Sequence, residues 1–176
     1  LAVGRLPGQS FNPLFIYGGT GLGKTHLLHA IAREILAKKP DARITYVSAE
    51  EFTNQVVKSI HNRDMDDFRN RFRKNCDVLL MDDAHVLAGK ERTQEEFFYT
   101  FNALHEAQKQ IVLTCDKTPQ DIPRLEERLR SRFQWGLITD IKPPQLETRV
   151  AILNKKANRD ALELPNDVAF YLASLV

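Results

Sequence analysis

Residues 18–25 read Gly-Gly-Thr-Gly-Leu-Gly-Lys-Thr, a spacing that fits the phosphate-binding pattern G-x-x-x-x-G-K-[ST]. The glycines allow the backbone to turn, so that successive N–H groups face phosphates at the positive end of the following helix. Lys24 then reaches the β- and γ-phosphates, and the hydroxyl of Thr25 is a ligand for Mg²⁺. The stretch predicts binding of ATP or ADP with Mg²⁺ through Gly19, Thr20, Gly21, Leu22, Gly23, Lys24, Thr25 and His26.

A second candidate group is the carboxylate pair Asp82-Asp83, which follows the apolar run 78–81. Phosphate-loop proteins need an Asp at the end of such a strand, because it helps to hold the Mg²⁺ that the loop hydroxyl binds. Asp82 is our candidate for this role, and Asp83 is placed to orient or deprotonate the attacking water. The competing interpretation is a helix cap or a surface turn.

Polar residues also end the next apolar run, where Thr114 and Asp116 flank Cys115. In doubly wound sheets the ligand binds at the carboxyl ends of the strands. Thr114 and Asp116 are therefore expected to sense the γ-phosphate, although an Asp at a strand end is also an ordinary turn residue.

Two basic stretches have alternative interpretations. Arg124, Arg128 and Arg132 are spaced four residues apart, so on a helix they share one face. That face either meets solvent or is offered to the γ-phosphate of a neighbouring subunit. The charged stretch 63–74, with apolar residues at helical spacing, is either a solvated helix face or an interaction surface.

Strands and helices alternate along the chain, which predicts an α/β fold with a doubly wound, parallel, five-stranded sheet. Capping boxes are expected at Ser48 with Glu51 and at Thr93 with Glu96. Residues 1–142 form the expected nucleotide-binding core, and 143–176 form a linker and the start of a small helical lid. The expected strands are 14–17, 43–48, 78–83, 111–116 and 136–141. The expected helices are 26–38, about 51–60, a helix from the Thr93 cap to about 108, 146–159 and 165–176, and the segment 124–133 lines up its arginines if it is helical.

The composition is that of an ordinary globular protein, with 43% hydrophobic and 27% charged residues among 176. No apolar run approaches the roughly 18 residues needed to span a bilayer, so we expect a cytosolic protein. The net charge is only +2, and a DNA-binding surface must therefore be local. Cys76 and Cys115 lie far apart without zinc-type spacing, which predicts buried, reduced thiols.

The ordered set of motifs resembles the AAA+ domains of the bacterial DnaA family over essentially the whole chain. The most specific matching stretches are GGTGLGKTHLLHA, KERTQEEFFYTFNAL, and SRFQWGL followed by a double proline and ETRVAIL. The resemblance implies a domain that binds ATP, hydrolyses it slowly as a switch and forms a helical homo-oligomer on origin DNA. It also implies single-stranded DNA contacts that help to open the duplex, a cytoplasmic, nucleoid-associated location, and the replicative helicase or regulators as further partners.

The same resemblance implies roles for individual residues. Asp82 and Asp83 match the Walker B pair, and Asp116 matches the sensor 1 position. Arg132 matches the arginine finger that contacts ATP on the adjacent protomer, with Arg128 in the same interprotomer box. Residues 51–74 correspond to the helical insertion of initiators. Positions that contact single-stranded DNA in the family correspond to Val57, Lys58, Lys90, Arg92 and Thr93.

The chain departs from the family pattern at two places beside the expected site. Residues 82–86 read Asp-Asp-Ala-His-Val where Asp-Asp-Ile-Gln-Phe is common, and residues 114–117 read Thr-Cys-Asp-Lys where Thr-Ser-Asp-Arg is common. Both changes keep the acids, so the assignment stands. The alternatives are a helicase loader or transposition helper ATPase, a small-molecule kinase, and a regulatory homologue that does not hydrolyse ATP.

Overall fold

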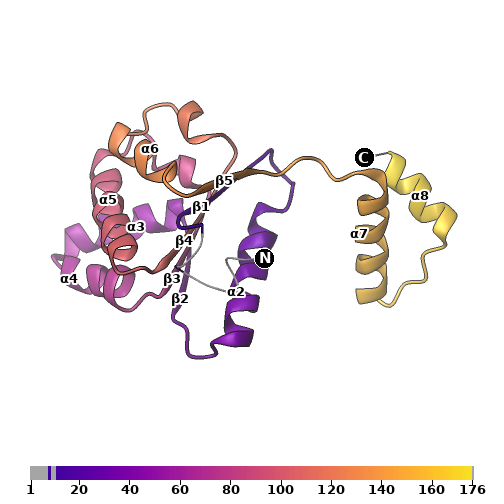
Figure 1. Cartoon of the computed structure of the whole chain (residues 1–176), viewed down its shortest axis with the longest axis horizontal. Helices are drawn as coiled ribbons and strands as arrows, with labels where there is room; N and C mark the ends of the chain where they lie inside the picture. The colour runs from indigo at the N-terminus through magenta and orange to yellow at the C-terminus, as the bar shows by residue number, and fades with distance from the viewer. Residues whose placement is uncertain (1–7, 9–10, 176) are drawn as a thin grey trace. The chain divides into compact units, whose positions relative to one another are not determined.

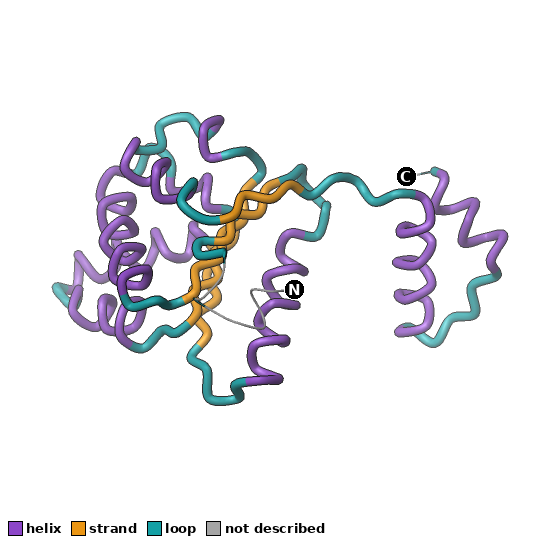
Figure 2. Tube along the Cα trace, viewed as in Figure 1, coloured by secondary structure: helices purple, strands orange, loops and turns teal. Residues whose placement is uncertain are grey.

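The computed structural model describes residue 8 and residues 11–175, and it contains a five-stranded sheet in which every pairing is parallel (Figure 2). The strand order is β2-β3-β4-β1-β5, so β1 lies between β4 and β5. This arrangement confirms the expected α/β fold. The strands are β1 (Leu14–Tyr17), β2 (Ile44–Ser48), β3 (Val78–Asp82), β4 (Gln110–Cys115) and β5 (Leu137–Asp140).

The chain divides into two compact units after Ile141. The helices of the first unit are α2 (Lys24–Lys38), α3 (Ala49–Asn62), α4 (Met65–Arg69), α5 (Glu91–Glu106) and α6 (Glu127–Phe133), with a π-helical turn η1 (Asn70–Lys74) and 3-10 turns η2 (Ala84–Leu87) and η3 (Pro119–Asp121). The second unit consists of α7 (Leu146–Arg159) and α8 (Asn166–Ser174), which pack through Val150, Ala169 and Ala173. None of the described helices is long and apolar enough to cross a membrane.

The two faces of the sheet are covered differently (Figure 1). Helix α2 covers one face through a stripe that includes Leu28 and Ile35, which are buried as helical spacing predicts. Helices α3 to α6 cover the other face around Phe52. The Phe52 ring lies 5.1–5.4 Å from three other rings, in edge-to-face geometry, those of Phe68, Phe72 and Phe97.

One expected helix cap is confirmed and the other is wrong. The Ser48 hydroxyl accepts a hydrogen bond from the Glu51 N–H at 3.1 Å, as the capping box requires. Helix α5, however, begins at Glu91, because the Gln94 N–H already donates to the Lys90 carbonyl. Thr93 therefore lies inside the first turn, with its side chain buried rather than capping.

The charged stretch 63–74 forms α4 and η1, and it is anchored on two sides. Phe68 and Phe72 are buried in the core. Arg69 and Arg73 both pair with the Glu96 carboxylate of α5, and burial lowers the pKa of Arg73. The cations on this side hold the segment to α5 instead of facing only solvent.

Candidate nucleotide-binding site

The glycine-rich loop joins the carboxyl end of β1 to the start of α2. Gly23 directly precedes α2 in a left-handed conformation with φ of 88°, and Gly21 has φ of 80°. L side chains rarely adopt this region, whereas glycine enters it at little cost. These two glycines allow the loop to turn directly into the helix N-terminus.

The side chain of Lys24 lies under this loop. Its Nζ donates hydrogen bonds to the carbonyls of Gly18 and Gly19 at 2.8 and 2.9 Å, and the residue is only 9% exposed. The ammonium is therefore held within the loop whose N–H groups face phosphates in such proteins.

Asp82 is the centre of a buried hydrogen-bond network. Its carboxylate accepts from the Thr25 hydroxyl at 2.7 Å, from the Tyr46 hydroxyl at 3.2 Å, and from the Thr114 hydroxyl. These donors come from α2, β2 and β4, so three elements fix the orientation of one carboxylate. The predicted pair Thr25 and Asp82 is thus brought into direct contact.

Tyr46 and Thr114 have roles that sequence reasoning did not assign. Sequence reasoning missed Tyr46, because a tyrosine in a strand usually indicates packing. The pKa of Tyr46 is raised mainly by burial and, to a smaller extent, by the charge of the neighbouring Asp82. Thr114 is fully buried, is bonded to Asp82 and does not line the cavity, so its expected sensing of the γ-phosphate stays a prediction. Its hydroxyl also accepts the Asp83 N–H at 3.0 Å, which fixes the peptide between the two acids.

A cavity of about 440 Å³ opens beside these groups. Asp83 reaches it from a left-handed backbone conformation, φ 55° and ψ 50°, which is uncommon for a non-glycine residue. His85 and Asp116 approach from η2 and from the end of β4. The cavity is lined by Thr20, Gly21, Gly23, Lys24, Thr25, His26, Asp83, His85 and Asp116, whereas Gly19 and Leu22 do not line it.

The arginines of α6 lie outside that cavity lining. Arg128 and Arg132 both stand over the Phe98 ring, at 4.8 and 5.4 Å from its centroid. Arg132 also stacks on Trp135 at 3.8 Å, and its Nε donates to Asn102 at 2.8 Å. The expected row of three arginines is wrong for Arg124, which precedes α6 in a left-handed conformation with φ of 59°.

The five residues expected at DNA lie on α3 and at the start of α5, which meet through the rings of Phe52 and Phe97. Val57 is 61% exposed, and Lys58 is also exposed. Arg92 is largely exposed and pairs only weakly with Glu95, at 3.4 Å. The side chain of Thr93 is buried, so only its backbone is available to a ligand.

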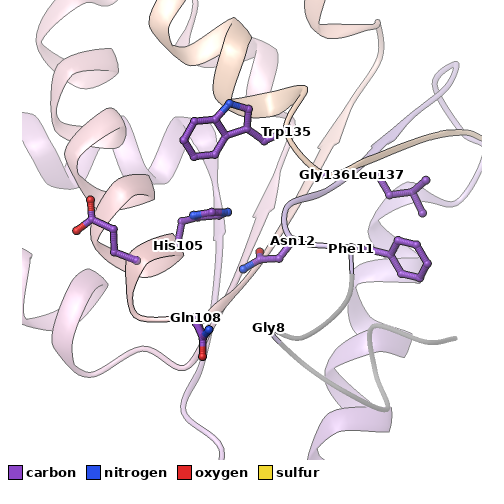
Figure 3. A pocket seen from close by; sticks show the side chains of 9 residues that line it. Gly8, Phe11, Asn12, His105, Gln108, Trp135, Gly136 and Leu137 are labelled. Atoms are coloured by element: carbon purple, nitrogen blue, oxygen red, sulfur yellow. The ribbon is translucent and has the colours of Figure 1, made fainter.

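A larger cavity of about 650 Å³ lies near the amino ends of β1, β4 and β5, opposite the carboxyl ends where the nucleotide cavity opens. Its lining includes Trp135 and His105 on one side and Phe11 and Leu137 on the other (Figure 3). The residues predicted to bind nucleotide do not line it. The cavity of about 440 Å³ is the candidate site, because the phosphate loop, Asp83 and Asp116 converge there.

Comparison with known proteins agrees with this geometry. Residues 1–140 match the family of the bacterial DnaA ATPase domain. The structure of domain III of the replication initiation protein DnaA from Thermotoga maritima has a TM-score of 0.93 and 44% identity, covering 98% of this chain and 71% of that one.

A replication initiator DnaA bound to AMPPCP and single-stranded DNA is 41% identical, with a TM-score of 0.88. That match covers 98% of this chain but 53% of the relative, so the chain spans about half of the relative's length. A DnaC helicase loader is 19% identical with a TM-score of 0.68, which shows a shared fold alone. The family match and the two close structures together show that this chain belongs to the bacterial DnaA ATPase domain family.

Proposed function

We propose that this domain binds Mg·ATP at the Gly18–Thr25 loop and uses the difference between ATP and ADP to control assembly on DNA. The observation that carries the proposal is the 2.7 Å hydrogen bond between Thr25 and Asp82 beside the cavity. A hydroxyl and a carboxylate held together at a phosphate loop are the donor set that Mg²⁺ takes in this class of site. Thr25 and Asp82 would hold this ion, which when bound would supply positive charge to offset the charge that develops on the phosphates.

The residues of the cavity have separate tasks in this proposal. Lys24 exchanges its two loop carbonyls for phosphate oxygens, which satisfy the same ammonium donors. Asp83 orients or deprotonates the attacking water from its strained position. The short side chain of Asp83 suits slow hydrolysis and a switch. Asp116 senses the γ-phosphate from the cavity wall.

Arg132 is assigned to the ATP of a neighbouring protomer, with Arg128 beside it at the interface. Neither arginine lines the cavity of its own chain, and Arg132 is held by aromatic rings and one amide rather than by a carboxylate. A guanidinium without a carboxylate partner retains its affinity for phosphate. This placement supports a helical homo-oligomer whose nucleotide sites are completed by the adjacent copy.

Single-stranded DNA is assigned to the surface formed by Val57, Lys58, Lys90, Arg92 and Thr93. The first N–H groups of α5 have no acceptor within the helix, so they suit a backbone phosphate, to which Thr93 contributes only its amide. Arg92 and Lys58 add positive charge that attracts the DNA phosphates. Val57 adds an exposed apolar side chain that can contact the DNA. In this proposal the 51–74 segment is the initiator insertion, residues 143–176 begin the lid, and the protein acts on origin DNA in the cytoplasm.

The test measures particle size and single-stranded DNA affinity with ATP and with ADP. We expect larger particles and tighter DNA binding with ATP, and a Lys24→Ala variant that behaves identically in both nucleotides. Identical particles and affinities with ATP and ADP in the unmodified protein would overturn the switch. Persistence of the ATP response in Lys24→Ala would instead reject the loop as its origin.

A further inference from the structure

Three metal-ligating side chains of different chemistry meet beside the nucleotide cavity, and two of them, His85 and Asp116, line it. His85 belongs to η2, Cys115 ends β4, and Asp116 follows it. One ligating atom from each lies within 4.8 Å of the other two. His85 and Cys115 are two of the five positions at which residues 82–86 and 114–117 depart from the family pattern given above.

Two of the three separations among these atoms are close to those of a tetrahedral metal site, and the third, between His85 and Cys115, is at most 4.8 Å. His85 Nδ1 lies 3.4 Å from Asp116 Oδ1, and Cys115 Sγ lies 3.7 Å from the same oxygen. Zinc bonds of about 2.0 Å to nitrogen or oxygen and about 2.3 Å to sulfur, at tetrahedral angles, place N and O about 3.3 Å apart and S and O about 3.5 Å apart. The observed separations are each within about 0.2 Å of these values.

The imidazole nitrogen that faces Asp116 makes no hydrogen bond within the described residues. His85 Nδ1 is buried from solvent and has no hydrogen bond to any residue of the described chain. A buried polar atom left unsatisfied costs about 1–3 kcal/mol, so such atoms call for an explanation. A coordinated cation would satisfy it, and the Lys117 N–H, which donates to Cys115 Sγ at 3.4 Å, would stabilise the thiolate form of that sulfur.

We propose that His85, Cys115 and Asp116 form a binding site for Zn²⁺, with the fourth coordination position open toward the nucleotide cavity. A set of one nitrogen, one sulfur and one oxygen suits a borderline-soft ion, whereas Mg²⁺ prefers oxygen alone. The site is therefore chemically distinct from the Thr25 and Asp82 pair. Burial raises the pKa of the Cys115 thiol to about 11, so the S–Zn bond forms as the thiol proton passes to the buffer.

Zinc at this place affects the nucleotide through Asp116. A carboxylate that ligates zinc is no longer available to the γ-phosphate, and the ion lies in the wall of the same cavity. This consequence rests on the proposed function, because it assumes that ATP occupies the cavity. Metal binding itself does not depend on nucleotide, and the experiment separates the two.

The first measurement titrates the protein with Co²⁺ and follows the near-ultraviolet absorption of a cobalt–thiolate bond, then displaces the cobalt with Zn²⁺. We expect one Co²⁺ per chain. Mutation of a residue that only hydrogen-bonds to a metal ligand typically lowers metal affinity by about 10–100-fold. Loss of a ligand itself, in Cys115→Ser or His85→Gln, is therefore expected to weaken Co²⁺ binding by more than about 100-fold. Ser and Gln are polar side chains of similar size to Cys and His, which favours folding of both variants.

Matched controls are Cys76→Ala, which removes the other buried thiol, and His61→Gln, which removes an exposed imidazole. Both controls are expected to bind Co²⁺ as the unmodified protein does. Absence of the thiolate band in the unmodified protein, its retention in Cys115→Ser, or unchanged affinity in His85→Gln would each overturn the site.

The second measurement compares Mg·ATP hydrolysis with and without one equivalent of Zn²⁺. We expect at least a tenfold loss in the unmodified protein and no change in Cys115→Ser. Lys24→Ala should retain the Co²⁺ band while losing ATP binding, so failure of the proposed nucleotide site leaves the metal site standing. Equal hydrolysis with and without zinc in a protein that binds it would reject the coupling through Asp116.

Discussion

The Asp82 carboxylate and the Arg132 guanidinium of α6 are held in opposite ways. Asp82 is 6% exposed and is fixed by hydroxyls from three elements of its own chain. Arg132 is partly exposed and rests on Trp135, Phe98 and Asn102. The first arrangement is complete within the chain, whereas the second holds a charged group ready without satisfying it by an opposite charge.

The difference fits our proposal that one chain carries halves of two different sites, one for its own nucleotide and one for a neighbour's. Groups that act on their own nucleotide can be fixed in advance by buried hydrogen bonds, since they never need to move far. A group that acts on a neighbour must be exposed and exchangeable, and contacts to aromatic rings, worth about 0.5–1 kcal/mol at exposed sites, allow this. The comparison therefore predicts that changes in the two regions separate ATP binding from assembly.

The largest expected effect comes from Lys24→Ala. Charge-assisted hydrogen bonds are worth about 1.5–3 kcal/mol each, so loss of the ammonium should weaken ATP binding by more than about 100-fold. Isothermal titration with Mg·ATP measures this, with Lys38→Ala, an exposed lysine paired with Glu34, as the matched control. Micromolar affinity retained in Lys24→Ala would contradict the role of the loop.

Asp82→Asn is expected to reduce ATP hydrolysis by about 100-fold while weakening ATP binding less, because the amide keeps the shape but loses the charge that holds Mg²⁺. Steady-state hydrolysis at several Mg²⁺ concentrations measures the change. The control is Asp160→Asn, which changes an exposed acid at the C-terminal end of α7 and should leave the rate unchanged. An unchanged rate and Mg²⁺ dependence would remove Asp82 from the metal site.

Arg132→Ala breaks the other half of the comparison. We expect ATP affinity to stay within about twofold, since the arginine lies outside its own cavity, while ATP-dependent assembly falls by at least about tenfold. Sedimentation with ATP and with ADP measures it, and Arg159→Ala is a matched exposed control. If assembly survives in Arg132→Ala, the two regions do not divide the work in this way.

The sequence predicted the parts of the site that local rules determine. The phosphate loop, the acids after β3 and the limits of β1 follow from residue order and hydrophobic runs. Thr93 was misplaced because a capping pattern cannot reveal that the helix ladder already starts at Lys90. Arg124 was misplaced because its positive φ before α6 depends on tertiary contacts. These include the hydrogen bonds that the Gly89 N–H and the Gln94 side-chain amide donate to the Arg124 carbonyl.

Contacts between distant segments were beyond sequence reasoning. Tyr46 meets Asp82 only because β2 and β3 are neighbours in the sheet, in a register that pairs Ser48 with Asp82. The approach of His85 to Cys115 and Asp116 likewise depends on how η2 folds against β4. A single sequence does not specify such pairings, since strand order and register arise from the whole fold.

The smallest expected effect comes from Trp135→Ala, which sharpens the comparison. Removing the ring should release Arg132 from a contact worth about 0.5–1 kcal/mol and thereby favour assembly by about two- to fivefold. The concentration at which ATP-bound particles form measures this, with Phe170→Ala, an exposed aromatic on α8, as the control. Weaker assembly in Trp135→Ala would mean that the ring positions the arginine rather than restraining it.

The contact between Arg132 and Trp135 also gives the molecule an optical signal of its own. Trp135 is the single tryptophan of the 176 residues, and its half-exposed indole lies against the guanidinium and the His105 ring. Indole fluorescence responds to charge and to nearby quenching groups. If Arg132 moves toward a neighbouring copy as we propose, the emission of this one known residue will change, and time-resolved fluorescence would then follow assembly without any added dye.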